Sequence, residues 1–163
     1  MTKIAVLALV AVAAAPLAGC GNSAPAKPTV QAPPVEKGVF ISASDCADSG
    51  KLSADVCGQI IDQAVAAHEK NAPTYKFLRL CTTAVGPERC AKGVDGQYRA
   101  RLQAFLVIMA QTPAAVPLYP AGSGVVGFVA ANKDKIDARD ETLIVSNDAL
   151  ALANENAKLS ASN

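Results

Sequence analysis

Tryptophan is absent from the 163-residue chain, aromatic residues make up only 4%, and His68 is the single histidine. So few aromatic rings weaken the case for a stacking platform that binds sugars or single-stranded nucleic acid. One histidine, with no G-x-S-x-G, HExxH or P-loop motif, leaves hydrolase and nucleotide-binding interpretations without their usual residues. We therefore expect a protein that is not an enzyme and has no catalytic residues.

Long runs of one residue class are missing as well. The formal charges nearly cancel, at +1 overall, and no run of like charges exceeds two residues. This balance favours neither a nucleic-acid groove nor an anionic membrane surface as a partner. The longest apolar run covers residues 4–15. It is too short for a transmembrane helix, which needs about twenty apolar residues.

The first twenty residues have the form of an export signal. Lys3 precedes the apolar run, small residues follow it, and Leu17-Ala18-Gly19-Cys20 resembles the lipobox of bacterial lipoproteins. In that motif the cysteine thiol receives a diacylglyceryl group, the peptidase cuts before the cysteine, and the freed amine is usually acylated. An ordinary cleaved signal, in which Cys20 is incidental, is the alternative.

We therefore expect a signal peptide over residues 1–19 and a lipid anchor on Cys20. The anchor would be an S-diacylglycerol with an N-acyl chain such as palmitate, and we expect no cofactor. Two or more acyl chains hold a protein firmly, at ~0.8 kcal/mol per buried methylene. Gly21 follows where an aspartate would favour retention in the inner membrane. In a Gram-negative host we therefore expect the outer membrane, with the protein facing the periplasm.

Residues 20–37 form the expected linker between this anchor and a folded domain. The stretch GNSAPAKPTVQAPPVEK is rich in proline and has no hydrophobic periodicity. It cannot bury a core, and it favours extended polyproline conformations that reach roughly 50 Å at ~3.1 Å per residue. We expect a disordered Pro-rich tether that holds the domain clear of the membrane.

Two stretches of the body repeat one pattern, GVFISASDCADSGKLSADVC at residues 38–57 and PTYKFLRLCTTAVGPERC at residues 73–90. Each places an aromatic residue six positions before a cysteine and ends on another cysteine. Four body cysteines, an even number in an exported chain, predict disulfides. The sets are Phe40, Cys46 and Cys57, and Tyr75, Cys81 and Cys90.

Four cysteines permit three pairings, and the duplication favours one bridge within each unit. Bridges Cys46–Cys57 and Cys81–Cys90 would each close a loop of about ten residues, contributing roughly 3 kcal/mol in the chain-entropy model. Crossed pairing that joins the two units is the alternative.

Metal binding and thiol chemistry are further interpretations of these cysteines. Structural zinc ligands come as close pairs two to four residues apart. Here ten and eight residues separate the cysteines of a unit, and His68 lies a helix away. No Cys-x-x-Cys motif is present, and Arg89 beside Cys90 is the only feature that would activate a thiol. We expect no metal site, and we expect His68 to be a partly buried helix residue.

Residues 53–70 predict the clearest helix, with apolar side chains on one face and polar ones on the other. Ser53 is a good N-cap. Asn71 and Pro73 predict the end, since asparagine tolerates the left-handed conformation and proline cannot continue a helix. The apolar face consists of Val56, Cys57, Ile60, Ile61, Ala64, Val65 and His68.

A second helix is expected over residues 97–111 and ends at Thr112-Pro113. Its FLVIMA segment is apolar nearly all round, so we expect it to be buried, with an exposed docking patch as the alternative. Residues 147–158 predict a last helix, although its two leucines, Leu150 and Leu152, are spaced irregularly for one.

Extended segments are expected between these helices. Residues 116–119 and 125–131 predict a hairpin that turns through Gly122-Ser123-Gly124, and residues 142–146 predict a third strand. We therefore expect an α+β fold, a small disulfide-stapled domain with one or two amphipathic helices and a short antiparallel hairpin. The expected division is a stapled helical region over residues 38–111 and a hairpin with a C-terminal segment over residues 112–163.

The lipobox and the two cysteine units resemble the YgiB family of bacterial envelope lipoproteins. So do Ala72-Pro73-Thr74-Tyr75, Pro117-Leu118-Tyr119 and Gly127-Phe128, and the resemblance covers roughly residues 17–132. It implies lipidation at Cys20 and pairing among the four body cysteines, but no particular activity. Relatives are often encoded beside an ATP-grasp enzyme resembling glutathionylspermidine synthase, which implies a shared envelope process.

The chain departs from that family pattern in places. Asp45 precedes Cys46 as in the family, whereas Leu80 replaces the usual acid before Cys81. The family's Gly- and Met-rich middle and long low-complexity tail are replaced here by FLVIMA and by a short charged tail.

The function expected from these features is that of a non-enzymatic, lipid-anchored envelope protein, structural or interacting. Its partners would be the membrane, through the anchor, and an unknown envelope protein, with no nucleic acid. A thiol-redox or metal-binding lipoprotein in envelope stress defence is the alternative. A small-ligand binder using the aliphatic strands and residues 105–109 is a third hypothesis.

Overall fold

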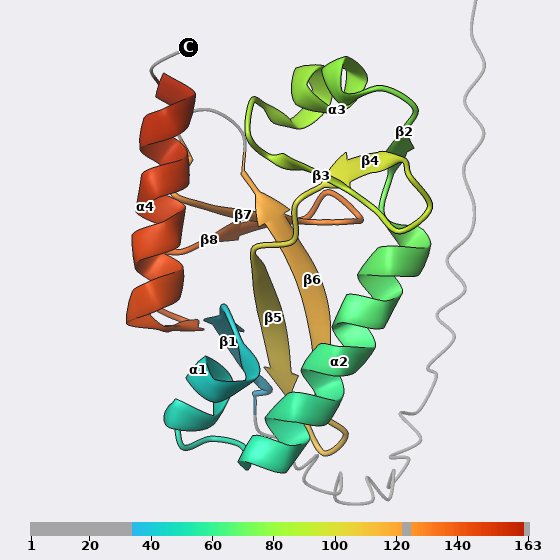
Figure 1. The fold of residues 1–163 in the computed structure, drawn as a ribbon. Helices are drawn as coiled ribbons and strands as arrows, with labels where there is room; N and C mark the ends of the chain where they lie inside the picture. Colours follow the sequence, from blue (N-terminus) through green and yellow to red (C-terminus); the bar gives the residue numbers. More distant parts are fainter. Residues whose placement is uncertain (1–33, 122–124, 162–163) are drawn as a thin grey trace, which may run out of the picture. The chain divides into compact units, whose positions relative to one another are not determined.

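The computed structural model describes residues 34–121 and 125–161 (Figure 1). They form four helices and nine strands, and the predicted α+β class is confirmed. The elements are β1 (Glu36–Phe40), α1 (Ala43–Asp48), α2 (Ala54–Asn71), β2 (Thr74–Tyr75), α3 (Leu78–Val85), β3 (Cys90–Lys92), β4 (Tyr98–Ala100), β5 (Ala104–Met109), β6 (Ala114–Pro120), β7 (Gly127–Ala130), β8 (Lys135–Asp137), β9 (Ile144–Val145) and α4 (Asn147–Ala161).

A six-stranded sheet in the order β8-β7-β6-β5-β1-β9 is the centre of the domain. Its strands are antiparallel to their neighbours, except that β9 runs parallel to β1. β5 pairs with β1 on one side and β6 on the other, so Leu106 lies opposite both Val39 and Val116. The first strand of the domain therefore pairs with a strand from its middle.

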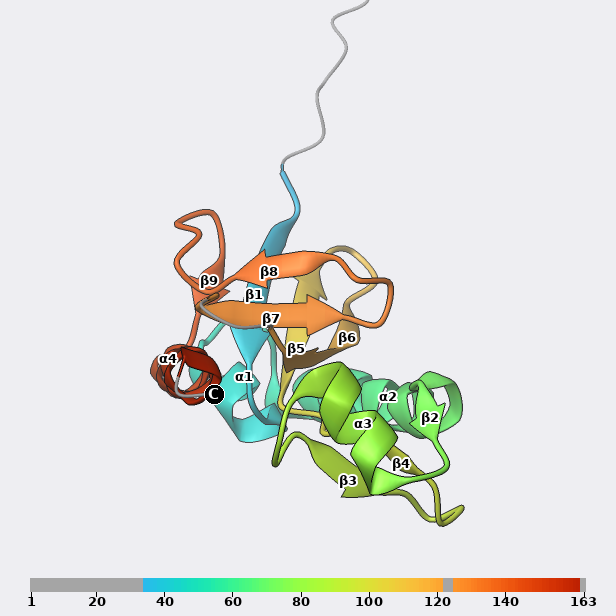
Figure 2. The same cartoon turned by 90° about the horizontal axis from the view of Figure 1, so that it is seen from above.

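Helices cover both faces of this sheet, as the view from above shows (Figure 2). α4 packs against β7 and β1, whereas α2 packs against β6 and α1 against β1 and α2. Successive side chains of a strand point to opposite faces. Val39 therefore joins the core beneath α4, and Phe40 joins the core beneath α1 and α2.

Between α2 and β5 the chain forms a smaller unit, residues 73–101, which we call the inserted unit. It contains a three-stranded antiparallel sheet in the order β2-β4-β3, and α3 packs on all three strands. Tyr75, Tyr98 and Lys92 lie in one row across this sheet. The inserted unit lies at the C-terminal end of α2 (Figure 1).

The helix predicted over residues 53–70 is confirmed as α2. The Ser53 hydroxyl accepts a hydrogen bond from the Val56 amide, as expected of an N-cap. The helix ends before Pro73 as predicted, whereas the left-handed cap expected at Asn71 is not formed. Asn71 is still helical, and Ala72 is extended at φ −62° and ψ 140° because the following proline disfavours the helical region for it.

The helix predicted over residues 97–111 is wrong, because this segment forms β4 and β5. β5 is a central strand that is covered on both faces, and Ala104 to Val107 are all buried. A short apolar run of this kind fits a buried helix and a buried strand equally well. Pairing with β1 and β6, distant in sequence, decides between them. Residues 105–107 thus lie in the core, with Ile108 and Met109 half-buried.

The strands of the predicted hairpin are confirmed. β6 and β7 are antiparallel, with Leu118 opposite Ala130, while the predicted turn at 122–124 lies outside the described residues. The third predicted strand is β9. β5 and β6 pair across the predicted division at residues 111 and 112, so both segments contribute to one sheet.

α4 confirms the predicted last helix and explains its irregular leucines. Ala149 and Ala153 are fully buried in the core beneath the helix, and Leu150 and Leu152 are only partly buried beside them. Residues four apart share one helix face, so alanines rather than leucines form the inner stripe.

The predicted signal peptide and most of the predicted linker lie outside the described residues, and β1 begins within the predicted linker at Glu36. In the part of the chain that the structure describes, none of the helices is long and apolar enough to cross a membrane.

Candidate functional site

The first predicted bridge joins two helices. Cys46 on α1 and Cys57 on α2 form a disulfide with their Cα atoms 5.9 Å apart. Both side chains are buried in the core beneath these helices, next to Phe40. A six-residue helix such as α1 is too short to be stable alone. The bridge therefore stabilises α1 in place on α2.

The second predicted bridge lies inside the inserted unit. Cys81 on α3 and Cys90 on β3 form a disulfide with their Cα atoms 6.1 Å apart, and Cys81 is fully buried. α3 starts after Phe77 without a side-chain cap. The bridge thus holds a short, uncapped helix against its sheet. Pairing within each unit is confirmed, and crossed pairing is not present.

The two repeated sequence units have the same secondary structure only up to the first cysteine of each unit. In both units a strand carrying the aromatic residue leads into a short helix carrying the first cysteine, β1 into α1 and β2 into α3. The second cysteine lies on a helix in one unit and on a strand in the other. Each unit therefore contains one internal disulfide, but the two units do not have the same fold.

Asp45, the acid before Cys46, connects three elements. Its Oδ2 accepts hydrogen bonds from the Ile41 amide at 2.8 Å and from the Ser146 hydroxyl at 2.6 Å. The Ser146 Oγ in turn accepts from the Ala149 amide in the first turn of α4. One carboxylate thus joins the end of β1, α1 and the start of α4. Leu80, at the matching position of the second unit, is exposed instead.

The one histidine of the chain lies in a buried polar contact. His68 Nδ1 and the Tyr119 hydroxyl are 2.9 Å apart, and His68 Nε2 is 4.0 Å from Glu69 Oε1. Burial lowers the pKa of His68 below the ordinary 6.5, Glu69 acts in the opposite direction, and Arg99 adds to the lowering. Burial also raises the pKa of Tyr119. The pair is therefore neutral, and it ties α2 to β6.

Arg99 anchors the inserted unit to the end of α2. Its guanidinium donates to the Glu69 carbonyl at 2.6 Å and to Glu69 Oε2 at 3.0 Å, and it pairs with Asp95 Oδ2 at 2.8 Å. The side chain is 2% exposed, so these acceptors compensate a buried charge. Gly93 lies against it, and a Cβ there would come within 2.6 Å of the guanidinium.

Arg89 makes a second connection from the inserted unit. It is buried and donates to the Ala121 carbonyl at 3.0 Å and to the Asn156 carbonyl at 2.7 Å. The Asn156 amide also pairs with the Gln103 amide through bonds of 2.6 and 3.2 Å. The inserted unit is thus tied to β6 and α4 as well as to α2.

The inserted unit exposes apolar side chains at the start of α3, on Phe77 before the helix and in its first turn. Phe77, Leu78 and Leu80 are 59%, 47% and 43% exposed, and Lys76 and Arg79 beside them are exposed as well. Lys76 Nζ lies 5.8 Å from the centre of the Phe77 ring. We call these five residues the α3 patch.

Two hollows lie on the surface. His68 and Tyr119, whose pKa values are shifted, line neither of them. One, of about 360 Å³, is lined by residues that include Asp45, Asp48 and Asp148, and the other, of about 510 Å³, by residues that include Arg101 and Glu155. Among the residues described, no three His, Cys, Asp or Glu side chains are arranged to hold a metal ion.

The predicted lipobox residues, Leu17, Ala18, Gly19 and Cys20, lie outside the described residues, whereas the four body cysteines are placed in their two bridges. Sequence reasoning missed Asp45, Arg89 and Arg99 as connecting residues. Only Asp45 had a signal, its place directly before a bridged cysteine. Arg89 and Arg99 have no such signal for a connecting role, because their acceptors come from segments distant in the sequence.

Replacing Asp45 by alanine should destabilise the domain by about 2–3 kcal/mol, because a half-buried amide and the Ser146 hydroxyl lose a charged acceptor. Chemical denaturation measures the change. Asp48→Ala is the matched control, since Asp48 is an exposed carboxylate on the same helix, and should stay within about 0.5 kcal/mol of the parent protein. Equal losses in both variants would contradict the connecting role of Asp45.

Stability should fall on mild acidification because of His68. Its folded pKa is lowered, so the unfolded chain binds the proton first as the pH falls below 6.5. The contribution is complete above about pH 7 and is lost as the pH falls through the lowered folded pKa, by at most about 1.4 kcal/mol per pH unit.

Denaturation at a series of pH values tests this dependence. His68→Asn, which keeps a group able to bond Tyr119 but does not titrate there, should flatten the curve near pH 6. Tyr119→Phe removes only the hydroxyl and should keep the slope. An unchanged slope in His68→Asn would assign the pH dependence to other groups.

Comparison with known proteins identifies a family. The model of a family described as "Protein of unknown function (DUF1190)" matches residues 34–124, more than half of the chain. The matched range includes both disulfides, the inserted unit and β1 to β6. No curated protein and no solved structure matches. The chain belongs to the DUF1190 family.

Proposed function

We propose that this chain is a non-enzymatic, lipid-anchored lipoprotein of the bacterial cell envelope. A signal peptide over residues 1–19 directs export, Cys20 carries the lipid, and the stapled domain acts as a structural or interaction module. The outer membrane, on its periplasmic side, is the proposed location. YgiB-like lipoproteins are the finer class that the cysteine units and the lipobox support.

The arrangement of the cysteines carries this proposal. Of the five in the chain, four are used in two bridges, and the remaining one is Cys20 in the lipobox. Disulfides persist in oxidising compartments such as the periplasm and are rare in the cytosol. Two bridges in one small domain therefore support export, and an odd cysteine at the end of a lipobox supports lipidation.

The alternative, a thiol-redox or metal-binding lipoprotein, needs free or easily reduced thiols. Cys46, Cys57 and Cys81 are each 1% exposed or less. Reductants and metals reach such sulfur atoms only after the domain opens. Burial therefore favours the structural interpretation of the bridges.

Fatty-acid labelling of the expressed chain in bacteria tests the proposal. Label should be incorporated into the parent protein and lost in Cys20→Ala, because the thiol that accepts the diacylglyceryl group is missing. A variant carrying Cys46→Ser and Cys57→Ser should keep the label, which excludes acylation of these body cysteines. An unlabelled parent protein, or one processed at another residue with an unmodified Cys20, would contradict the lipid anchor.

A further inference from the structure

Exposed apolar side chains are concentrated in the inserted unit. Among the described residues six large hydrophobics are exposed, and four of these belong to the inserted unit, the three of the α3 patch and Val94, at 98%. Val94 lies in the loop between β3 and β4 of the same unit. β2 leads from Tyr75 toward Lys76 and Phe77, at the end of the small sheet where the loop between β3 and β4 turns.

Basic residues are also concentrated in the inserted unit, whereas acidic residues predominate in the rest of the domain. The inserted unit contains six basic and two acidic residues, whereas the rest of residues 34–161 contains seven basic and twelve acidic. Of the six, Arg89 and Arg99 are buried, and four remain at the surface. These are Lys76, Arg79, Lys92 and Arg101.

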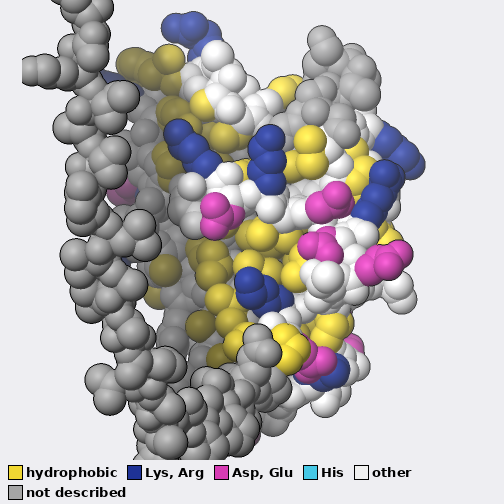
Figure 3. Space-filling view, turned by 180° about the vertical axis from the view of Figure 1, so that it is seen from behind, with side chains coloured by type: hydrophobic (Ala, Val, Ile, Leu, Met, Phe, Trp, Pro, Cys, Tyr) yellow, Lys and Arg dark blue, Asp and Glu magenta, His cyan; other side chains and the backbone are white. Residues whose placement is uncertain are grey.

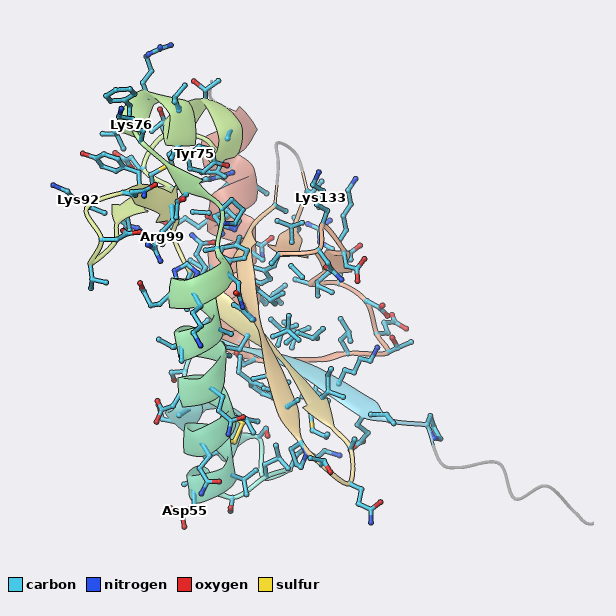
Figure 4. All side chains as sticks on the ribbon, turned by 90° about the vertical axis from the view of Figure 1, so that its right-hand side faces the viewer. Asp55, Tyr75, Lys76, Lys92, Arg99 and Lys133 are labelled. Carbon is cyan, nitrogen blue, oxygen red and sulfur yellow. A yellow bond between two sulfur atoms is a disulfide. The ribbon has the colours of Figure 1, made fainter. Side chains whose placement is uncertain are left out.

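Outside the inserted unit, the described residues expose two large hydrophobic side chains, Val35 and Val65. On the face seen from behind, acidic and basic side chains are interspersed, with hydrophobic side chains between them (Figure 3). Lys76 and Lys92 lie together at one end of the domain, and Asp55 lies at the other end of α2 (Figure 4). The domain therefore has a basic, apolar end within a nearly neutral chain. The net charge of +1 for the whole chain does not reveal this separation of basic from acidic residues.

We propose that the α3 patch binds the surface of an anionic phospholipid membrane. Phe77, Leu78 and Leu80 enter the region between headgroups and acyl chains, and Lys76 and Arg79 lie against the phosphate groups. Basic side chains beside an apolar face are the combination that binds this interface. The acidic remainder of the domain is repelled by the same surface, which orients the inserted unit toward it.

The form of the patch favours lipid over a protein partner. It projects from one short helix held by a disulfide, and neither of the two hollows lies within it. Lipid headgroups rearrange around an exposed basic and apolar surface, so the patch needs no partner of complementary shape. Pro34 lies fourteen residues after Cys20. At ~3.1 Å each they span roughly 43 Å, about the diameter of a compact domain of this size, so an anchored chain can bring the patch to its own bilayer.

Vesicle binding by residues 34–163, with both disulfides intact, tests the proposal. All described elements, both cores and both bridges lie inside this segment, so it contains what holds the domain together. It should bind phosphatidylglycerol-containing vesicles, bind pure phosphatidylcholine much more weakly, and lose affinity as salt is raised. Phe77→Ser with Leu80→Ser should weaken binding about tenfold or more.

Matched controls separate the patch from general effects. Val65→Ser removes an exposed apolar residue of α2, and Lys135→Gln removes an exposed charge of β8, and neither should change binding. Lys76→Gln with Arg79→Gln should weaken binding and reduce its salt dependence. Thermal unfolding of each variant confirms that the fold is kept.

Several results would overturn lipid binding by the patch. These are equal binding to both kinds of vesicle, no binding, or equal losses in patch and control variants. A change in self-association without a change in vesicle binding would assign the patch to a second copy of the chain. The proposal of lipid binding rests on the proposed function, which locates the domain beside an envelope membrane. The segment lacks Cys20, so failure here leaves the labelling result for the anchor unaffected.

Discussion

The antiparallel pairing of β1 with β5 determines where every other element can lie. It brings residues 36–40 beside residues 105–109, so the chain between them must leave the sheet and return to it. That excursion contains α1, α2 and the inserted unit. Because closing a long loop costs entropy before its contacts form, the excursion needs fixed points along its length. The two disulfides shorten its effective length, and the buried polar contacts attach it to the sheet and to α4.

Those polar contacts share one design. Asp45, Arg89 and Arg99 each connect elements far apart in the sequence, and each forms at least one hydrogen bond with a backbone group. A buried charge contributes little net stability but is costly to leave unpaired, so such residues penalise alternative arrangements more than they stabilise the native one. The inserted unit is therefore held in one position, so Phe77, Leu78 and Leu80 stay exposed at the start of α3 and do not collapse onto the core.

Local patterns were sufficient for some of the fold and not for the rest. The α2 helix, its Ser53 cap and the two bridges follow from periodicity, capping chemistry and duplication within short stretches. The segment 97–111 could not be assigned in this way, because a buried apolar run is a central strand only if β1 and β6 lie beside it. The contacts of Arg99 and Asp45 are invisible for the same reason. Each depends on partners placed by the sheet, Glu69 for one and Ser146 for the other.

The central claim is that the four body cysteines are structural and that Cys20 alone is modified. A non-reducing peptide map by mass spectrometry tests it most directly, on protein extracted from membranes with free thiols trapped at lysis. The account predicts peptides linked as Cys46–Cys57 and Cys81–Cys90, together with an acylated N-terminal Cys20. A trapped free thiol among the four, or a linkage between the two units, would contradict it and make the cysteines a reactive site.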